Sequence, residues 1–572
     1  MSMYLLQFFI IYAISKTTFG KPNIIILVAD DLGFNDVSMH GSTQIPTPNL
    51  DALAQNGVLL NNYYVCPVCS PSRGALMTGL YPIHTGLQRG AIPSSQPYGL
   101  PLKHIIMPQW FKELNYATHA VGKIFVLKQA ASLFKYLIGT QHDVIFVDQP
   151  WGLPLTHTLL PQHLRKLGYA THAVGKWHLG FFRKEYTPVY RGFDSHYGYW
   201  GGKEDYYDHT QQMGELWGLD FHQNMKPVTD GLGKYSTFLF ADKAVNIIKN
   251  HNTSKPLFLY VAYQAVHSAN LYAPLQAPLK YVKRFRRIKD KNRRLFAAMV
   301  AAMDDSVYNI MIALKNKKMH QNSIIIFTTD NGGPAAGFND NAASNWPLRG
   351  VKATLWEGGV RGLSFIWSHL IKYPARVSMD LMHITDWLPT LYTAAGGDVS
   401  SLGKLDGYNM WDTLSLKKPS PRSEVLLNID PINRVSALRV GNFKLIQGTV
   451  YNGKWDGWYG PSGRENKSIH EIFAFQLPGS EIVCKPKPTD ASSNCKPAEK
   501  PCLFDVMEDP CEYYNLADDH PEIVKMMLNK LSKYNSTAVP PGNKPMDPRS
   551  NPKYHNYQWT NWMDYVEKTN DM

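Results

Sequence analysis

Residues 21–41 read KPNIIILVADDLGFNDVSMHG, and the apolar run inside this stretch indicates the fold class. The run at 23–29, NIIILVA, is rich in β-branched residues and has no polar alternation, which is typical of a strand buried on both faces of a parallel sheet. Two later runs have the same character, SIIIFTT at 323–329 and PLFLYVAY at 256–263. Apolar residues at three- and four-residue spacing predict a helix at 295–314. This alternation predicts an α/β fold, with a large, mostly parallel sheet and helices on both faces.

Polar side chains follow each of these runs. The first ends in Asp30-Asp31, the run at 323–329 ends in Asp330-Asn331, and the third leads to His267. One such pair could simply cap the next helix or turn. In open α/β sheets, however, ligands bind at the carboxyl ends of the strands, so strands ending in DD and DN favour one shared site.

Length and composition restrict the classes of protein to which the chain can belong. A chain of 572 residues is long enough for two or more domains, or for one large α/β domain with an appendage. With 44% apolar and 18% charged residues it is globular and not disordered. The net charge of +13 favours anionic partners, and nucleic acid, anionic lipid and sulfated polysaccharide all fit that sign.

The N-terminus predicts entry into the secretory pathway. Residues 1–20, MSMYLLQFFIIYAISKTTFG, resemble a signal peptide cut near Gly20, although a positively charged n-region is missing; a short buried strand or helix is the alternative. Sequons at Asn252, Asn466 and Asn535 are compatible with that route. No later run reaches the ~20 apolar residues that a membrane span needs.

The sequence pattern changes beyond about residue 420. Short runs such as 424–428 and 443–448, separated by turn residues, predict a small antiparallel sheet, and 521–534 predicts a helix. We therefore expect a catalytic α/β domain at 21–420 and a C-terminal subdomain and tail at 421–572.

Four of the six cysteines lie near the C-terminus. In a secreted chain they could form two disulfides, and three pairings are possible. The simplest is Cys484–Cys495 with Cys502–Cys511. The spacings fit no usual zinc pattern.

One segment is duplicated. Residues 88–123 and 141–176 align without gaps at an offset of 53, and both copies end in YATHAVGK. The second copy continues Lys176-Trp177-His178, whereas the first continues Lys123-Ile124-Phe125. A tandem exon duplication, or two alternative exons joined in one gene model, explains the pattern, with 88–140 as the insertion. A sheet built for one copy has no evident place for both.

The pentapeptide Cys69-Ser70-Pro71-Ser72-Arg73 precedes an apolar helical stretch at 75–80. Taken alone, Cys69 could be a low-pKa thiol at a helix N-terminus, but an inert buried cysteine is the favoured interpretation. Its companions change that interpretation. They are GKWHLG at 175–180, RGFDSHYGYWGGKEDYYDH at 191–209, TDNGG at 329–333, LRGVKATLWEGGVRG at 348–362 and CLFDVMEDPCEYYNLAD at 502–518.

With these motifs in this order, the chain resembles the type I sulfatases of the alkaline-phosphatase-like superfamily, and among them the arylsulfatase B group. The resemblance covers nearly everything from Lys21 to about residue 522, apart from the duplicated insert. It implies that a formylglycine-generating enzyme oxidises Cys69 to formylglycine, guided by Pro71 and Arg73. One hydroxyl of the hydrated aldehyde attacks sulfur, and the other expels sulfate by re-forming the aldehyde, whereas serine would be trapped as a stable ester.

The resemblance also implies a metal site. Asp30, Asp31, Asp330 and Asn331, together with residue 69, would hold one Ca²⁺ per subunit. Their side chains offer only oxygen donors, which hard cations prefer, and this argues against zinc. The ion would lower the pKa of the nucleophile and neutralise sulfate charge.

Cationic residues take further roles by resemblance. Arg73 and Lys176 would hold the hydrated aldehyde and the metal shell, and His178 would bond the hydroxyl that expels sulfate. Lys352 and His267 would bind the sulfate and protonate the leaving alcohol. The segment after His267 is longer than is usual in the family, and Cys66 is an unusual neighbour that could interfere with oxidation at Cys69.

The expected protein is thus a lysosomal or extracellular sulfuric ester hydrolase that acts on sulfated N-acetylgalactosamine in glycosaminoglycan, with neither a nucleic-acid partner nor a membrane span. One alternative is a phosphodiesterase or phosphonate hydrolase of the same superfold, which the cysteine in C-x-P-x-R disfavours. Another is a catalytically impaired, glycan-binding or aberrant splice product. Nine Lys or Arg at 280–294 could bind an acidic glycan or form a solvated helix face.

Overall fold

The computed structural model describes residues 20–88, 117–123, 173–460, 477–542 and 547–565. Residues 1–19 of the predicted signal peptide and the sequon at Asn466 lie outside these ranges.

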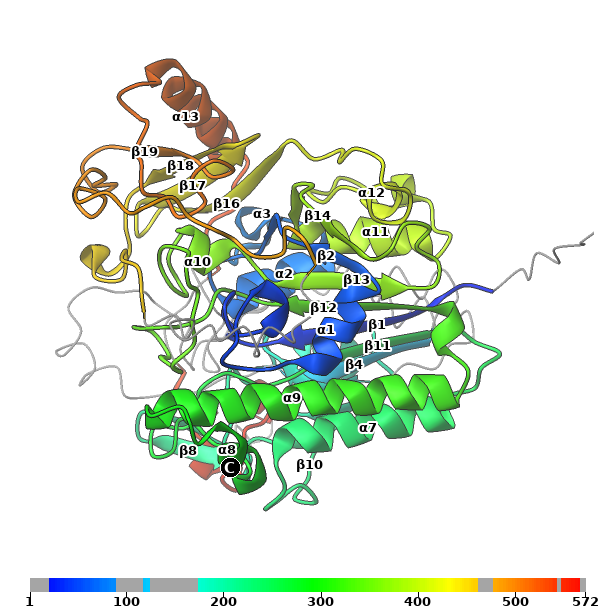
Figure 1. Ribbon diagram of the computed structural model, residues 1–572. Coiled ribbons are helices and arrows are strands. Elements are labelled where there is room, and N and C mark those ends of the chain that lie inside the picture. Colours follow the sequence, from blue (N-terminus) through cyan, green and yellow to red (C-terminus); the bar gives the residue numbers. More distant parts are fainter. Residues whose placement is uncertain (1–19, 89–116, 124–172, 461–476, 543–546, 566–572) are drawn as a thin grey trace, which may run out of the picture.

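An eleven-stranded mixed sheet forms the body of the protein (Figure 1). At its centre β1 (Asn23–Ala29) pairs in parallel with β11 (Leu257–Ala262) on one side and with β12 (Ser323–Thr329) on the other. All three predicted strands are confirmed. The described strands on the β12 side are β13 (Ser364–Ser368), β2 (Val58–Leu60) and β14 (Arg376–Ser378); on the β11 side they are β4 (Ala117–Lys123), β5 (Ala173–Trp177), β6 (His196–Gly198), β9 (His222–Gln223) and β10 (Lys226–Pro227).

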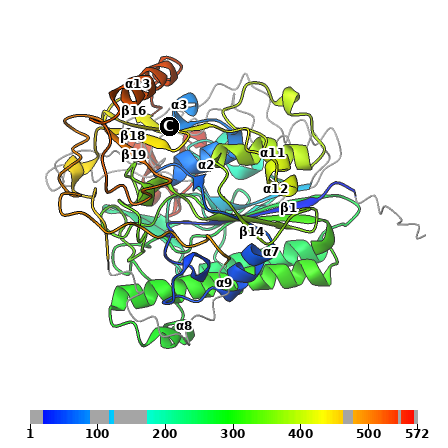
Figure 2. The same ribbon diagram turned by 45° about the horizontal axis from the view of Figure 1, so that its top comes forward.

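Alternation along β1 builds two cores, one on each face of the sheet. Ile24, Ile26 and Val28 face α2 (Cys69–Thr78) and α11 (Trp387–Ala394). Ile25, Leu27 and Ala29 face α7 (Ser236–Asn250) and α9 (Lys291–Asn316). Figure 2 shows the two helix layers on opposite sides of the sheet. This confirms the predicted α/β class, because a strand that is apolar at every position must be covered on both faces.

Helix α9 contains the predicted helix at 295–314. By length and hydropathy alone it could cross a membrane, but 67% of its most apolar window is buried in the protein. Packing against α7 and the sheet makes it a core helix.

The C-terminal part forms the predicted antiparallel sheet and helix. Its strands are β16 (Glu424–Asp430), β17 (Val435–Val440), β18 (Phe443–Gln447) and β19 (Cys502–Asp505), and α13 (Pro521–Ser536) covers one face. On that face Leu438 packs with Met527. On the other face Ala437 packs with Val360 of the large body.

Smaller elements complete the fold. Short helices are α1 (Pro48–Gln55), α3 (Pro82–Thr85), α8 (Leu279–Val282), α10 (Glu357–Val360) and α12 (Trp411–Leu416). Two further strand pairs are β3 (Tyr63–Tyr64) with β15 (Met382–His383), and β7 (Thr210–Met213) with β8 (Leu216–Leu219).

The simplest disulfide pairing is wrong. The disulfides join Cys484 to Cys511 and Cys495 to Cys502, with Cα–Cα distances of 5.9 and 5.8 Å. The reason is the course of the chain after Cys502, which runs along β19 and a turn before it reaches Cys511. Cys511 then lies in a small cluster that includes Cys484.

Strands from both copies of the duplicated segment enter the sheet, so the expectation that a sheet built for one copy has no evident place for both is wrong. Strand β4, from the first copy, pairs with residues 257–260 of β11. Strand β5, from the second copy, pairs with β4 and also with Val261 and Ala262 at the carboxyl end of β11. Because the two strands share a sequence, both suit the same neighbour.

Deleting residues 88–140 should preserve the fold. One copy would then be available to pair along the whole of β11, and no second strand would compete for that position. We expect a single cooperative thermal unfolding transition with a Tm at or above that of the full chain, measured by circular dichroism or calorimetry. Loss of soluble, cooperatively folding protein would show instead that β4 is an integral strand.

Candidate active site

The carboxyl ends of β1 and β12 meet at one buried site, as predicted. Asp30 and Asp31 follow β1, and Asp330 and Asn331 follow β12; all four are buried. The Asp31 backbone N–H donates to Asp330 Oδ1 at 3.4 Å, and Asn331 Nδ2 donates to Asp31 Oδ1 at 2.7 Å. Parallel pairing of adjacent strands places both pairs at the same edge.

Three buried cations reach these carboxylates from separate segments. Arg73, on α2, donates to Asp330 Oδ2 at 2.7 Å and to Asp30 Oδ2 at 3.3 Å. Lys176, near the end of β5, contacts Asp30. Lys352 Nζ lies 2.6 Å from Asp31 Oδ1. Although burial lowers the pKa of the Lys352 ammonium, the charge of Asp31 raises it overall, so this lysine stays protonated.

Cys69 is the first residue of α2 and is buried. Its Sγ lies 3.2 Å from Nδ1 of His178, which follows β5. Burial raises the pKa of the Cys69 thiol to about 11, although the charges of Lys176 and Lys352 oppose the shift. Of the two interpretations of the unmodified side chain, a buried neutral thiol is therefore favoured over a low-pKa thiol at a helix N-terminus.

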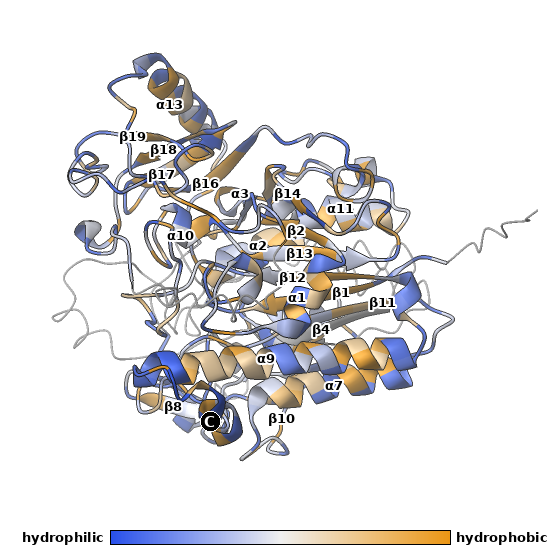
Figure 3. Cartoon of the chain, viewed as in Figure 1, coloured by the Kyte–Doolittle hydropathy of each residue, from blue (hydrophilic) through white to orange (hydrophobic). Residues whose placement is uncertain are grey.

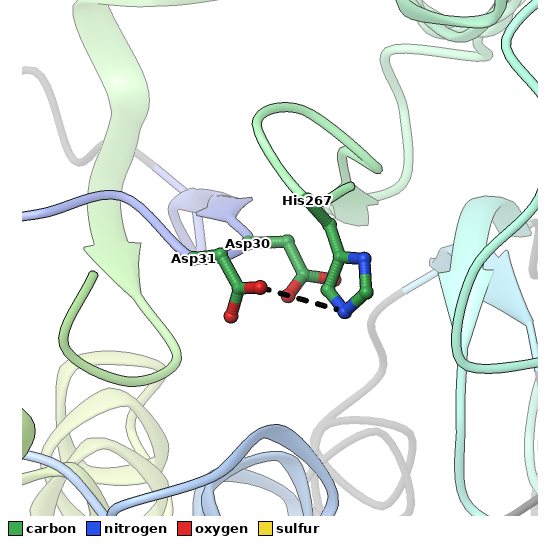
Figure 4. Close-up of side chains that lie close together, drawn as sticks. All are labelled: Asp30, Asp31 and His267. Atoms are coloured by element: carbon green, nitrogen blue, oxygen red, sulfur yellow. Dashed lines mark ion pairs between the residues drawn. The ribbon is translucent and has the colours of Figure 1, made fainter. Parts of the chain in front are cut away.

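His267 lies in the loop after β11 and faces Asp31, with Nε2 3.4 Å from Asp31 Oδ2 (Figure 4). Its Nδ1 bonds the Ser268 carbonyl at 2.7 Å. Burial, and then the charge of Lys352, lower the pKa of the ring well below its usual value. These effects favour the neutral form of the His267 ring.

The residues present fit a divalent cation. Ligand atoms of Asp30, Asp31 and His267 lie within 4.8 Å of one another. Two buried oxygens, Asp30 Oδ1 and Asn331 Oδ1, have no hydrogen-bond partner among the described residues. Burial and the charge of Asp330 raise the pKa of Asp30 to about 7, which means that the ionised carboxylate is disfavoured at this position. A bound cation would stabilise the ionised form. The structure brings the predicted oxygen donors together at one place and adds His267 beside them, and their role as metal ligands stays a prediction.

Close glycine packing holds two of the loops together. A Cβ on Gly332 would stand 1.9 Å from the carbonyl oxygen of Gly358, so only glycine lets TDNGG approach WEGG this closely. The backbone N–H of Lys352, between these motifs, donates to the Gly333 carbonyl at 3.3 Å.

Sequence reasoning missed two residues at this site. Asn339 Nδ2 lies 3.0 Å from Nε2 of His267. Lys203 follows Gly202, where a Cβ would stand 3.0 Å from Nε2 of His178. Burial and the charge of Lys352 lower the pKa of the Lys203 ammonium to about 8. Lys203 belongs to the GGKEDYYDH motif, but no strand ends there, so the strand-end pattern could not single it out.

Cys66 is a buried free cysteine. Its backbone N–H donates to Ser72 Oγ at 2.8 Å, and its side chain belongs to the core beneath α2. Burial raises the pKa of the Cys66 thiol to about 12, so this thiol is neutral in the folded protein.

Comparison of the sequence with known protein families identifies the family of this chain. The family model for sulfatases matches residues 22–131 and 130–397, and the break between the two matches falls in the spacer that separates the two copies of the duplicated segment. The chain belongs to the sulfatase family. Sulfatases hydrolyse sulfate esters, and members generally use a metal ion and formylglycine. The individual roles of Cys69, Arg73, Lys176, His178, His267 and Lys352 stay predictions.

Several relatives of this sulfatase cover most of its length. Mouse (Mus musculus) arylsulfatase J is 39% identical over 559 residues, which is 95% of this chain and 80% of the relative. Human (Homo sapiens) N-acetylgalactosamine-6-sulfatase is 29% identical over 405 residues, 69% of this chain and 66% of the relative. The crystal structure of Ps i-CgsB superposes with a TM-score of 0.66 at 26% identity, covering 91% of this chain and 94% of the other.

Metal removal should make the stability of this sulfatase depend on pH. In the metal-free protein the folded-state pKa of Asp30, about 7, lies above its ordinary 3.8, so the folded state binds the extra proton and gains stability as pH falls through 7. From about pH 8 to about pH 5.5 we expect a gain of about 2 kcal/mol relative to the Ca²⁺-loaded form.

The measurement is the unfolding free energy of chelator-treated and Ca²⁺-loaded protein at both pH values. Asp304 and Glu512, whose pKa burial also raises to about 7, contribute to both forms and cancel in the difference. Burial also raises the pKa of Asp31, which adds to the difference, so Asp30→Asn should reduce it and not abolish it. Parallel pH profiles for the two wild-type forms would contradict metal binding at Asp30.

Proposed function

We propose that this sulfatase removes sulfate esters from sulfated N-acetylgalactosamine in glycosaminoglycan, with formylglycine at residue 69 as the nucleophile and Ca²⁺ as the metal. The observation that carries the proposal is the position of residue 69. It begins α2 beside His178 and lies in the electrostatic field of Lys176 and Lys352, next to the carboxylate cluster.

The neutral thiol of Cys69 supports oxidation as its working chemistry. A thiol with a pKa of about 11 offers little thiolate at neutral pH, so unmodified Cys69 would be a poor nucleophile. The hydrated aldehyde replaces it with two hydroxyls. His178, 3.2 Å from Sγ, is placed to accept a proton from one of them when sulfate is expelled.

Asp30, Asp31, Asp330 and Asn331 would hold the cation, with His267 beside them. When bound, the ion supplies charge that lowers the pKa of the nucleophile and offsets the charge of the sulfate. The choice of Ca²⁺ rests on the oxygen donors and on the sulfatase resemblance.

Lys352 and His267 would receive the sulfate and its leaving oxygen. The buried lysine stays charged and stabilises the negative charge of the transition state. Burial and the charge of Lys352 lower the pKa of His267, so the neutral ring is favoured. An anionic ester bound beside it would favour protonation of the ring, which could then donate that proton to the leaving alcohol.

We propose the amino-sugar substrate because the sequence motifs and the relatives of this chain resemble sulfatases that act on sulfated N-acetylgalactosamine. The motifs resemble the arylsulfatase B group, which acts on the 4-sulfate, whereas one relative is named for the 6-sulfate of N-acetylgalactosamine. We favour the 4-sulfate because the motif resemblance spans the regions that build the site. Aryl sulfates would be artificial substrates.

We also propose a secretory route to the lysosome or extracellular space, with maturation by a formylglycine-generating enzyme. Both sequon asparagines in the described ranges, Asn252 and Asn535, are exposed and could carry glycans. Two disulfides fit an oxidising compartment.

The alternative is an impaired glycan-binding or aberrant splice product, and the duplicated segment supports it. Strand β4 sits between β11 and β5 and carries Lys123 without the Trp-His that follows Lys176. Aryl sulfate turnover that appears only after residues 88–140 are deleted would favour this alternative for the full chain.

Mass spectrometry of a peptide spanning residues 61–73, from protein secreted by a eukaryotic host, tests the nucleophile. We expect residue 69 to be about 18 Da lighter than cysteine, because SH₂ is exchanged for O. Cys69→Ser should fold normally but lose multiple turnover by on the order of a thousandfold or more, since the sulfated serine cannot release its ester. Unmodified Cys69 from a host that oxidises a control sulfatase would refute the proposal.

Paired sugar substrates test the specificity. We expect kcat/KM for the 4-sulfate of N-acetylgalactosamine to exceed that for the 6-sulfate by about a hundredfold, since one site must align the scissile ester with residue 69. An aryl sulfate that carries no sugar, measured in parallel, reports whether the site is competent. Faster cleavage of the 6-sulfate by competent enzyme would overturn the 4-sulfate assignment.

A further inference from the structure

A dense group of cations lies on the surface beside the loop that carries His267. It is built by α8, by the 3-10 turn at Lys283–Phe285 and by the N-terminal turn of α9. Figure 1 places α8 at the edge of the molecule, and Figure 3 shows hydrophilic colour at the N-terminal end of α9. We call the exposed members the basic surface: Lys280, Lys283, Arg284, Arg286, Arg287, Lys289 and Lys291.

Apolar anchors hold this segment in place and turn its cations outward. Tyr281 and Phe285 are buried and belong to the core that includes α7 and α9. The Tyr281 hydroxyl donates to Asp305 at 2.7 Å. Arg293 is used internally, because it pairs with Asp36 at 2.5 Å, so it is not part of the basic surface. The outward cations are thus presented by a fixed segment.

Acidic neighbours are too few to neutralise this charge. The stretch 280–294 contains nine Lys or Arg and one carboxylate, that of Asp290, which caps α9 by accepting from the Arg293 N–H at 2.6 Å. Arg284 pairs with Asp305 at 3.4 Å. Within the part of the chain that the structure describes, no ion pair within 4.0 Å involves Lys280, Lys283, Arg286, Lys289 or Lys291.

A solvated helix face normally interleaves acids with its bases at three- and four-residue spacing. The stretch 280–294 lacks this interleaving, so its positive charges repel one another. An anionic partner would offset that electrostatic repulsion.

We propose that the basic surface binds a sulfated glycosaminoglycan chain. The partner class rests on the proposed function, since a polymer of sulfated sugars brings many regularly spaced anions to the same enzyme. Binding there needs no chemistry at residue 69, so it is a property separate from hydrolysis.

The loop between His267 and α8 connects the basic surface to the active site. The Ala269 N–H donates to the Pro274 carbonyl at 2.7 Å, and the Tyr272 hydroxyl bonds Asp208 at 2.8 Å. These bonds order the intervening residues. A polymer bound to the basic surface, which follows this ordered loop in the chain, would raise the local concentration of sulfate esters around the enzyme.

The experiment compares two fourfold variants of the full-length chain, each losing four positive charges. The surface variant is Lys283→Gln, Arg284→Gln, Arg286→Gln and Arg287→Gln. The control variant removes exposed lysines elsewhere: Lys372→Gln, Lys404→Gln, Lys525→Gln and Lys533→Gln. Binding to fluorescent chondroitin sulfate is measured as Kd against salt concentration, and aryl sulfate turnover and Tm serve as checks on folding.

We expect the surface variant to bind about tenfold or more weakly at about 0.15 M salt, with a shallower salt dependence of Kd because fewer cations pair with sulfate groups of the polymer. The control variant should stay within about twofold of wild type, and neither variant should change aryl sulfate turnover. Equal weakening in both variants would show that net charge alone is responsible and would overturn the proposal. Unchanged binding by the surface variant would also overturn it.

Two further arms separate the partner classes and the two proposals. Wild-type binding to duplex DNA or to phosphatidylserine vesicles as tight as to chondroitin sulfate would overturn the sulfated-glycan assignment. If the enzyme cleaves aryl sulfate but no sulfated sugar, the proposed substrate fails, while chondroitin sulfate binding by the surface variant still decides whether the basic surface binds the polymer.

Discussion

Three buried carboxylates at one edge of the sheet, Asp30, Asp31 and Asp330, impose a charge that the rest of the site must balance. Each repels the others in a setting with little water, and burial raises the pKa of Asp30 to about 7. Removing any one of the cations that face them would leave an uncompensated buried charge, which is strongly destabilising. The fold must therefore deliver Arg73, Lys176 and Lys352 to this point.

These cations come from segments that have no local relation to one another. Arg73 extends from the first turns of α2, Lys176 from β5, and Lys352 from a loop held by close glycine contacts. The same charges act on the other residues of the site: Lys352 helps to keep His267 neutral, and Lys176 moderates the pKa of Cys69. One electrostatic balance thus sets the protonation of several groups at once.

A second buried network joins the C-terminal sheet to this region. Lys444, on β18, lies 2.9 Å from Glu357 and 2.8 Å from Glu512, and all three are buried. Glu357 begins α10, whose Gly358 packs against Gly332 beside the metal-binding candidates. The C-terminal sheet therefore braces an active-site loop.

The basic surface contrasts with these buried ion pairs, because its cations are exposed to water and have few acidic residues nearby.

The class of fold and much of the site could be predicted from local sequence patterns. Uniform apolar runs require burial on both faces, and strands that end in Asp-Asp and Asp-Asn converge once they are parallel neighbours. The folded chain was needed to establish the disulfide partners of Cys484 and Cys495, the shared pairing of β4 and β5 with β11, and the contact of His267 with Asp31. It also showed that burial, and not the neighbouring lysines, dominates the pKa of the Cys69 thiol. The physical reason is common to all of these: pairing and protonation depend on which distant segments exclude water from one another, and no local pattern encodes that.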